Sequence, residues 1–255
     1  MSNKWEREKR REERLQAEAK VDSGERRTKL LQLAAAAVFL AIVAVVILIV
    51  VNSGSEGGDA ENLQGAGDVD ALVGGVPQNG MTLGKPSAKV ELIEYGDLQC
   101  PACKAYAEEI LPQVIENKVD SGEAKITFHN FTIIGEQSPP AGAAALAAGE
   151  QGRGWNYLEL FYRNQGMENS GYADDAFLKA VAEGAGVKDI AQWESDRKSD
   201  KVTGEVQRTT AEAQRLGFES TPSFAIEGPG TNGLELLGNP GSAEEIEEAI
   251  DSAAG

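Results

Sequence analysis

The 255-residue chain has few of the residues that build metal centres, and its charges are unequal. It contains two cysteines and one histidine, so a four-ligand zinc site would need a carboxylate or a second subunit to complete it. Lysine and arginine number 24 against 41 acidic residues, which gives a net charge of −17. Nucleic-acid binding depends on positive charge facing phosphates. We therefore predict no metal site and no nucleic-acid partner.

One long stretch of the chain lacks charge altogether. Residues 30–51 (LLQLAAAAVFLAIVAVVILIVV) contain no charged side chain, and a helix of this length crosses the roughly 30 Å hydrocarbon core of a bilayer. A cleaved signal peptide has a shorter apolar region of roughly 7 to 15 residues, so we expect an uncleaved single-pass anchor. Residues 1–29 carry ten basic against seven acidic residues, and basic residues beside a span stay in the cytoplasm. The expected topology is a cytoplasmic N-terminus in the cell membrane with an extracytoplasmic C-terminal domain.

Behind the expected anchor, residues 52–80 are rich in glycine, aspartate and asparagine and poor in large apolar side chains. A segment of this composition cannot bury enough surface to fold, so we expect a flexible linker there. The chain then divides into a charged tail over 1–29, a transmembrane anchor over 30–51, the linker, and an exported domain over 81–255. An exported domain meets an oxidising environment, where a cysteine pair can persist as a disulfide.

The first part of the exported domain has the pattern of a strand, a helix and a strand. Residues 89–95 (KVELIEY) and 125–134 (KITFHNFTII) are rich in β-branched and aromatic side chains, which predicts two strands. Between them, residues 101–118 place apolar side chains at helical spacing, and Pro112 should kink this helix. The order predicts a βαβ unit with parallel strands.

The rest of the domain changes from helices back to strands. Residues 139–217 show helical spacing throughout, with no strand candidate. Residues 222–228 and 233–238 read as two short strands joined by a glycine- and proline-rich turn, which predicts a hairpin. Residues 242–250 (SAEEIEEAI) predict a final helix that opens with a capping box, formed by its first serine and the glutamate three residues later. The order is sheet, helical insertion and sheet.

The two cysteines, Cys100 and Cys103, lie in DLQCPACKAY at 97–106. A structural disulfide across so short a loop removes little chain entropy. Cys100 comes where the first strand passes into the helix, and there the unpaired N–H groups and the positive end of the helix dipole favour a thiolate. Cys103 lies one turn further on and can close back onto Cys100. A catalytic dithiol explains this placement better than a structural disulfide or a zinc site.

Three segments together resemble one protein family. They are GDLQCPACKAYAEEILPQV around the cysteines, WNYLELFYRNQ in the helical part and STPSFAIEG before the hairpin. They are similar to the DsbA family in its membrane-anchored form, over about residues 81–253. The resemblance implies an α/β thioredoxin-like fold with an all-helical subdomain inserted at about 139–217. It also implies an extracytoplasmic thiol–disulfide oxidoreductase that uses no cofactor beyond its own redox-active disulfide.

The resemblance implies roles for individual residues. Cys100 should exchange disulfides with substrates, and Cys103 should resolve the mixed disulfide. The peptide bond between Thr221 and Pro222 should be cis, with Pro222 facing the Cys100 sulfur and the Thr221 backbone free to pair with an extended substrate. Glu94 should be a buried carboxylate that carries the Cys103 proton, although its sequence alone fits a solvent-exposed acid on a strand equally well.

One departure from the family pattern affects the direction of catalysis. The dipeptide between the cysteines is Pro101-Ala102, whereas strongly oxidising members carry a histidine at the second of these positions. Without that histidine the reduced form should be less favoured and the disulfide less oxidising. We expect disulfide formation in exported cysteine-containing proteins, with a membrane partner that resets the cysteines. A reductase or isomerase of the same fold, or a non-catalytic peptide-binding holdase, are the alternatives.

Overall fold

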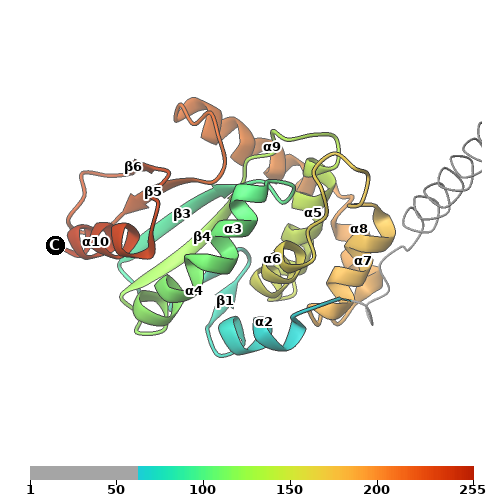
Figure 1. Ribbon diagram of the computed structural model, residues 1–255, viewed down its shortest axis with the longest axis horizontal. Coiled ribbons are helices and arrows are strands. Elements are labelled where there is room, and N and C mark those ends of the chain that lie inside the picture. Colours follow the sequence, from blue (N-terminus) through green and yellow to red (C-terminus); the bar gives the residue numbers. More distant parts are fainter. Residues whose placement is uncertain (1–62) are drawn as a thin grey trace, which may run out of the picture. The chain divides into compact units, whose positions relative to one another are not determined.

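A computed structural model describes residues 63–255 of the chain (Figure 1). The expected tail and anchor, and the first part of the expected linker, lie outside these residues. Across residues 63–255, no helix has the length and apolar character needed to cross a membrane.

The domain is built on a six-stranded mixed sheet with the order β1-β2-β4-β3-β5-β6. The two longest strands, β3 and β4, run parallel in the centre, and every other neighbouring pair is antiparallel. This confirms the parallel start of the sheet and the later hairpin. The strands are β1 (Gln78–Asn79), β2 (Thr82–Leu83), β3 (Val90–Gly96), β4 (Ala124–Asn130), β5 (Ser223–Glu227) and β6 (Glu235–Gly238).

The connection between β3 and β4 is helical, as predicted, and it is broken where the proline lies. Helix α3 (Pro101–Glu109) ends before Pro112, and the chain continues as α4 (Leu111–Val114) and the π-helix η2 (Ile115–Val119). Proline lacks a backbone N–H and its ring collides with the preceding turn, so an interruption here is expected.

Strand β4 is shorter than the sequence predicted. It ends at Asn130, whereas apolar and β-branched residues continue to residue 134. The backbone N–H groups of Ile133 and Ile134 donate to the carboxylate of Asp97, at 2.8 and 3.0 Å, and not to a neighbouring strand. A side-chain acceptor thus replaces the sheet and turns the chain into a loop.

The helical insertion is confirmed. It comprises α5 (Ser138–Gly149), α6 (Gly154–Arg163), α7 (Asp175–Gly184), α8 (Ile190–Asp196) and α9 (Asp200–Arg215). Its two buried tryptophans use their ring N–H groups, with Trp155 donating to the carbonyl of Met81 and Trp193 to that of Ala144, both at 2.9 Å. The first of these bonds ties the insertion to the edge of the sheet, which Figure 1 shows beside α6.

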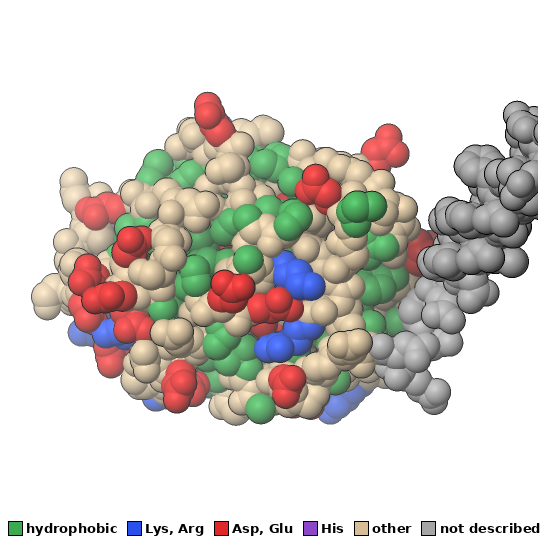
Figure 2. Space-filling view, viewed as in Figure 1, with side chains coloured by type: hydrophobic (Ala, Val, Ile, Leu, Met, Phe, Trp, Pro, Cys, Tyr) green, Lys and Arg blue, Asp and Glu red, His purple; other side chains and the backbone are tan. Residues whose placement is uncertain are grey.

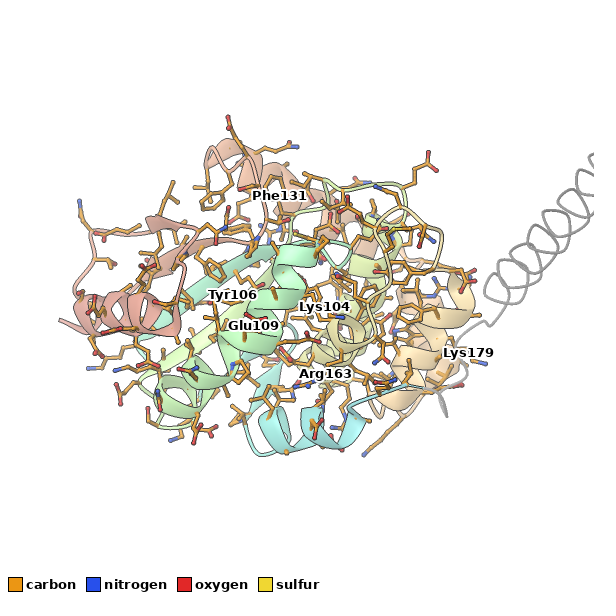
Figure 3. All side chains as sticks on the ribbon, in the orientation of Figure 1. Lys104, Tyr106, Glu109, Phe131, Arg163 and Lys179 are labelled. Atoms are coloured by element: carbon orange, nitrogen blue, oxygen red, sulfur yellow. The ribbon has the colours of Figure 1, made fainter. Side chains whose placement is uncertain are left out.

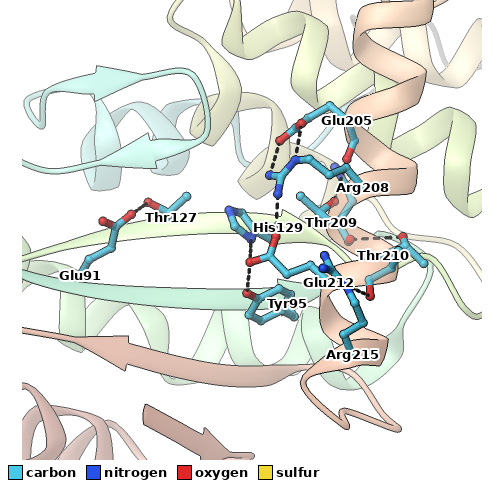
Figure 4. A network of polar contacts seen from close by, with 12 residues as sticks. Glu91, Tyr95, Thr127, His129, Glu205, Arg208, Thr209, Thr210, Glu212 and Arg215 are labelled. Carbon is cyan, nitrogen blue, oxygen red and sulfur yellow. Dashed lines mark hydrogen bonds and ion pairs between the residues drawn. The ribbon is translucent and has the colours of Figure 1, made fainter. Parts of the chain in front are cut away.

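Neighbouring residues of β3 point to opposite faces of the sheet, as in any strand. Tyr95 faces α9 and its hydroxyl donates to Glu212 at 3.0 Å (Figure 4). Arg208 on the same helix binds the carboxylates of Glu205 and Glu212, and His129 of β4 lies 4.0 Å from Glu212. Burial lowers the pKa of His129, so this network fastens α9 to the sheet around a neutral imidazole.

The expected linker is shorter than the sequence predicted. Residues 66–73 form helix α2 (Ala66–Val73), which buries Val69 and Val73, and β1 also lies within the range assigned to the linker. Asn156 of α6 donates to the Asp70 carboxylate at 3.1 Å, which holds α2 against the insertion. The two valines are four apart and therefore share one face of a helix, so a few apolar residues suffice once α6 supplies the surface. The ordered domain begins well before Met81.

The final helix, α10 (Ala243–Ala254), has one of the two hydrogen bonds of the predicted capping box, and the second bond is shifted by one residue. The hydroxyl of Ser242 accepts from the N–H of Glu245 at 3.2 Å. The carboxylate of Glu245 accepts from the N–H of Gly241 at 2.7 Å, one residue earlier than the standard box requires.

Candidate functional site

The two cysteines occupy the first turn of α3, directly after the central strand β3. Cys100 is the N-cap residue, with extended backbone angles, and Pro101 is the first residue of the helix. Proline suits this position because its missing N–H would have no partner there. Cys100 is 5% exposed and Cys103 is 0% exposed. Only the first thiol therefore touches solvent, while Pro101 and Ala102 are exposed beside it.

The loop before β5 reaches the same place from the other end of the domain. The Thr221–Pro222 peptide bond is cis, as predicted. The Cys100 thiol donates to the carbonyl oxygen of Thr221 at 3.3 Å. We expected that backbone to be free for a substrate; in the structure its carbonyl accepts from the protonated thiol, and this bond is lost when Cys100 ionises.

The surroundings of Cys100 lower its pKa to about 6. The hydrogen bond from the Cys103 thiol contributes most, and burial opposes it. The hydroxyl of Thr221 and the backbone N–H groups of Cys103 and Ala102 lower the pKa further. The two backbone donors lie at the start of α3, where N–H groups lack partners within the helix. Cys100 is therefore mostly a thiolate at neutral pH.

Cys103 behaves in the opposite way, and a carboxyl group lies beneath it. Burial raises the pKa of Cys103 well above its ordinary value, and the nearby charges of Cys100 and Glu94 raise it further. Glu94, on β3, is 1% exposed, which overturns the alternative of an acid in water. Its pKa is raised to about 8, first by burial and then by Glu159 and Cys100. Glu94 also lies near the Tyr106 side chain of α3, which is labelled in Figure 3.

Asp97, which was not predicted as a site residue, holds the loop before Cys100. Its side chain is fully buried, and Oδ1 accepts from the N–H of Gln99 at 2.9 Å. Oδ2 accepts from the N–H groups of Ile133 and Ile134 in the loop after β4. Its position three residues before Cys100 was the only feature of the sequence that could have pointed to a role for Asp97 at the site.

The helical insertion also holds this loop. Gln165, just after α6, donates to the carbonyl oxygens of Leu98 and Cys100, at 2.6 and 3.1 Å. The buried side chain of Gln99 donates to the hydroxyl of Ser138 at 2.9 Å. Since the insertion supplies both partners, the position of the nucleophile depends on residues that follow it by 38 positions or more. Sequence spacing alone could not identify them.

The arrangement suits dithiol chemistry. A thiolate that touches solvent lies at a helix start, a second thiol lies buried behind it, and a carboxyl group lies beneath the second thiol. Within residues 63–255, no group of three or more histidine, cysteine, aspartate or glutamate side chains is placed to hold a metal ion.

Comparisons with known proteins find a family model, curated relatives and solved structures that are similar to this chain. The sequence model of a family described as thioredoxin matches residues 77–252. The probable disulfide bond formation protein D of Bacillus cereus is 30% identical over 173 residues, which cover 67% of this chain and 76% of that protein. The crystal structure of oxidised BdbD from Bacillus subtilis superimposes with a TM-score of 0.61 at 20% identity, over 70% of this chain and 97% of the other. A thioredoxin-like oxidoreductase from Silicibacter pomeroyi gives 0.54 at 29% identity, over 72% and 96%.

Proposed function

Since the chain belongs to the thioredoxin family and is a DsbA-like thiol–disulfide oxidoreductase, we propose that it forms disulfide bonds in exported proteins outside the cytoplasm. Cys100 and Cys103 are the redox pair, and their disulfide is the oxidant. Pro101 and Ala102 shape the turn between them, and Thr221 and Pro222 border the substrate.

The reaction takes two exchange steps. A substrate thiolate attacks the Cys100 sulfur of the Cys100–Cys103 disulfide, and a bond forms between substrate and Cys100. Cys103 leaves with the electron pair and takes up a proton, which Glu94 donates from beneath it. A second substrate thiolate then attacks the substrate sulfur of the mixed disulfide, and Cys100 leaves as a thiolate. The substrate loses two electrons and the enzyme gains them.

The observation that carries this direction is the pKa of about 6 for Cys100. A stabilised thiolate is a good leaving group in the second step and favours the reduced form of the enzyme, so the disulfide passes readily to substrates. The exposed Ala102 contributes no charge to this stabilisation, which comes from the Cys103 thiol, the Thr221 hydroxyl and backbone N–H groups. The potential should accordingly be less oxidising than in members that carry a histidine there.

The remaining parts of the proposal concern location and partners. Residues 30–51 are proposed to anchor the chain in the cell membrane, with residues 1–29 in the cytoplasm. The domain then meets reduced or unfolded cysteine-containing proteins as they leave the membrane. A membrane redox partner is needed to reoxidise the cysteines, since each turnover leaves two electrons on them.

The redox state of the cysteines in living cells tests this direction. Free thiols are alkylated in fresh lysate, and the alkylated and unmodified forms are separated by size. A disulfide-forming enzyme should be mostly oxidised, whereas a mostly reduced pair would identify a reductase or isomerase and overturn the proposal.

Trapping of substrates tests the assignment of roles. Cys103→Ala cannot form the intramolecular disulfide, but its Cys100 thiolate can attack a disulfide of an exported protein, which forms a mixed disulfide and releases the other substrate sulfur as a thiolate. Because no Cys103 thiol is present to displace the substrate from Cys100, this variant should accumulate covalent complexes with exported proteins. The matched variant Cys100→Ser should accumulate none. If the Cys100→Ser protein still performs its cellular task and only suppresses aggregation of unfolded chains, the protein is a holdase and the exchange mechanism is wrong.

A further inference from the structure

Glu159 is a buried acid to which the two exchange steps assign no task. It lies in the middle of α6 and is 0% exposed. Neither of its carboxylate oxygens has a hydrogen-bond partner among residues 63–255. Burying an unpaired carboxylate is costly, and such a group holds its proton instead. A neutral acid of this kind can donate a proton to another group inside the protein.

Glu159 interacts electrostatically both with the buried Glu94 and with charged groups nearer the surface. On its inner side its charge interacts with Glu94, whose Oε1 is also buried and has no partner in the described part of the chain. On its outer side it interacts with Arg163 of α6 and Glu108 of α3. Glu108 is exposed and lies 3.9 Å from Lys104.

The outer groups form a charged surface over the packing of α3 against α6. Figure 2 shows acidic and basic side chains gathered in this part of the face, with apolar side chains around them. Figure 3 places the labelled Lys104 and Arg163 over these two helices. These side chains reach water, so a proton that leaves the interior beside them enters the solvent at this surface.

We propose that Glu159 relays protons between Glu94 and this surface, and so serves the Cys103 thiol through Glu94. Glu159 does not touch the reacting sulfurs. It is a positioning residue for the proton and not a catalytic residue. The inference rests on the proposed exchange at Cys100 and Cys103.

The relay conserves protons and moves no electrons. When Cys103 leaves as a thiolate, Glu94 gives it a proton and becomes a carboxylate. Glu159 then gives its proton to Glu94, and water at the surface between α3 and α6 reprotonates Glu159. When the enzyme is reoxidised, the Cys103 proton leaves along the same groups in the opposite direction.

The acidities of the groups fit this task. The pKa of Glu159 is raised to about 8 by burial, with Arg163 opposing and Glu108 adding to the rise. The pKa of Glu94 is also raised to about 8, so the two carboxyl groups have similar acidity. Two carboxyl groups of equal acidity exchange a proton with little driving force in either direction, and both hold protons at neutral pH without holding them tightly.

The other buried hydroxyls near Glu94 do not fit. Burial raises the pKa of Tyr106 and of Tyr162 well above the ordinary value for tyrosine, so neither phenol gives up its proton near neutral pH. The Tyr162 hydroxyl also donates to the carbonyl of Asp97 at 3.3 Å. The groups that face the relay are therefore Cys100, Cys103, Tyr106 and Tyr162 around Glu94, and Arg163 and Glu108 around Glu159.

The test compares two substitutions of Glu159 in the full-length chain purified in detergent. Glu159→Gln removes the proton and keeps the shape, while Glu159→Met removes it without burying another polar group. The rate at which a small dithiol reduces the Cys100–Cys103 disulfide is followed by stopped flow as a function of pH. We expect both variants to lose about tenfold near neutral pH, less than the ~100-fold typical of a direct general acid.

The titration of the individual carboxyl groups gives a second readout. Glutamate carboxyl carbons are followed by NMR, and the Glu94 midpoint should move to lower pH in both Glu159 variants because a neighbouring negative charge is gone. Glu108→Gln, a surface change that threatens no packing, should move the Glu159 midpoint to lower pH. Glu109→Gln, at the next and equally exposed residue of α3, is the matched control and should move neither midpoint, because the side chains of consecutive helical residues point in different directions.

The possible results distinguish a failure of the Glu159 relay from a failure of the proposed exchange function. Slower exchange together with a shifted Glu94 midpoint supports the relay. Wild-type rates in the Glu159 variants overturn it, as does slower exchange with an unmoved Glu94 midpoint, which would mean a purely structural role. If neither Glu159 variant folds, an unmoved Glu159 midpoint in Glu108→Gln overturns it and a shifted one supports it. A wild-type protein without exchange activity would refute the proposed function itself.

Discussion

Cys100 and Cys103 are the same residue type three positions apart, yet their thiols ionise in opposite directions. The first lies at the start of α3, where it accepts hydrogen bonds from Cys103, Thr221 and backbone N–H groups. The second is buried among the side chains of β3 and α6, where water cannot solvate a thiolate. One helical turn thus separates a nucleophile from a thiol that stays protonated.

This contrast predicts the effect of removing the second thiol. Cys103→Ala should raise the Cys100 pKa from about 6 by one to two units, because the Cys103 thiol is the largest stabilising donor. A hydrogen bond to a charged group contributes about 1.5–3 kcal/mol, which corresponds to about that shift. Cys103→Ser keeps a hydroxyl donor, so its Cys100 pKa should lie between those of the wild type and of Cys103→Ala. Thiolate ultraviolet absorbance against pH measures all three, and an unchanged midpoint in Cys103→Ala would assign the stabilisation to the backbone and Thr221.

At the scale of elements, α2 shows how little apolar surface is needed to order a segment. It buries Val69 and Val73, and its Asp70 carboxylate accepts from Asn156 of α6. A helix of eight residues is unstable alone in water, so α6 supplies most of its stability. The glycines and aspartates around the valines gave the whole segment the composition of a linker.

A pair of substitutions distinguishes a packed helix from a linker at residues 66–73. Val73→Ala should lower the free energy of unfolding by about 2 kcal/mol, since Val73 is fully buried. Gly67→Ala should raise it by about 0.5 kcal/mol, because an added methyl group meets no atom within 4 Å and alanine favours a helix. Denaturant unfolding of the full-length chain measures both. If neither substitution changes stability, α2 does not contribute to the fold.

At the scale of the whole domain, the fold places two acids in the interior, and neither forms an ion pair with another side chain among residues 63–255. Glu94 and Glu159 are both at most 1% exposed, and both have pKa values raised to about 8 from 4.5. The folded protein therefore keeps protons that the unfolded chain releases above about pH 4.5. Stability should be full below that pH and fall as the pH rises towards 8.

This fall of stability with rising pH predicts that a substitution of Glu94 stabilises the protein at high pH. Glu94→Gln should have nearly wild-type stability near pH 5 and should exceed it by about 3 kcal/mol near pH 8, because the glutamine has no proton to lose. The oxidised protein is used, so that the thiols do not titrate. Urea unfolding at the two values of pH measures the difference, with Glu109→Gln as the exposed control. A constant difference between variant and wild type would show that Glu94 is ionised throughout and is reached by water.

Local patterns in the sequence were enough to predict the main secondary-structure elements and the nucleophile. Residue spacing is local, so the parallel strands β3 and β4, the break before Pro112, the helical insertion and the final hairpin could all be predicted from it. The position of Cys100 at a helix start follows from the same local pattern. The resemblance to the DsbA family added the cis bond before Pro222.

The surroundings of those residues depend on contacts between distant segments and could be seen only in the folded domain. Glu94 read equally well as an exposed acid, and its burial depends on α6, which begins sixty residues later in the chain. The burial of Glu159 could not be predicted from the sequence, because an acid in an amphipathic helix is normally on the solvent side. Asp97 ends β4 early and Gln165 holds the Cys100 carbonyl through contacts with distant segments. Desolvation and hydrogen bonding across such separations set the pKa values of the site, and neither is a property of local sequence.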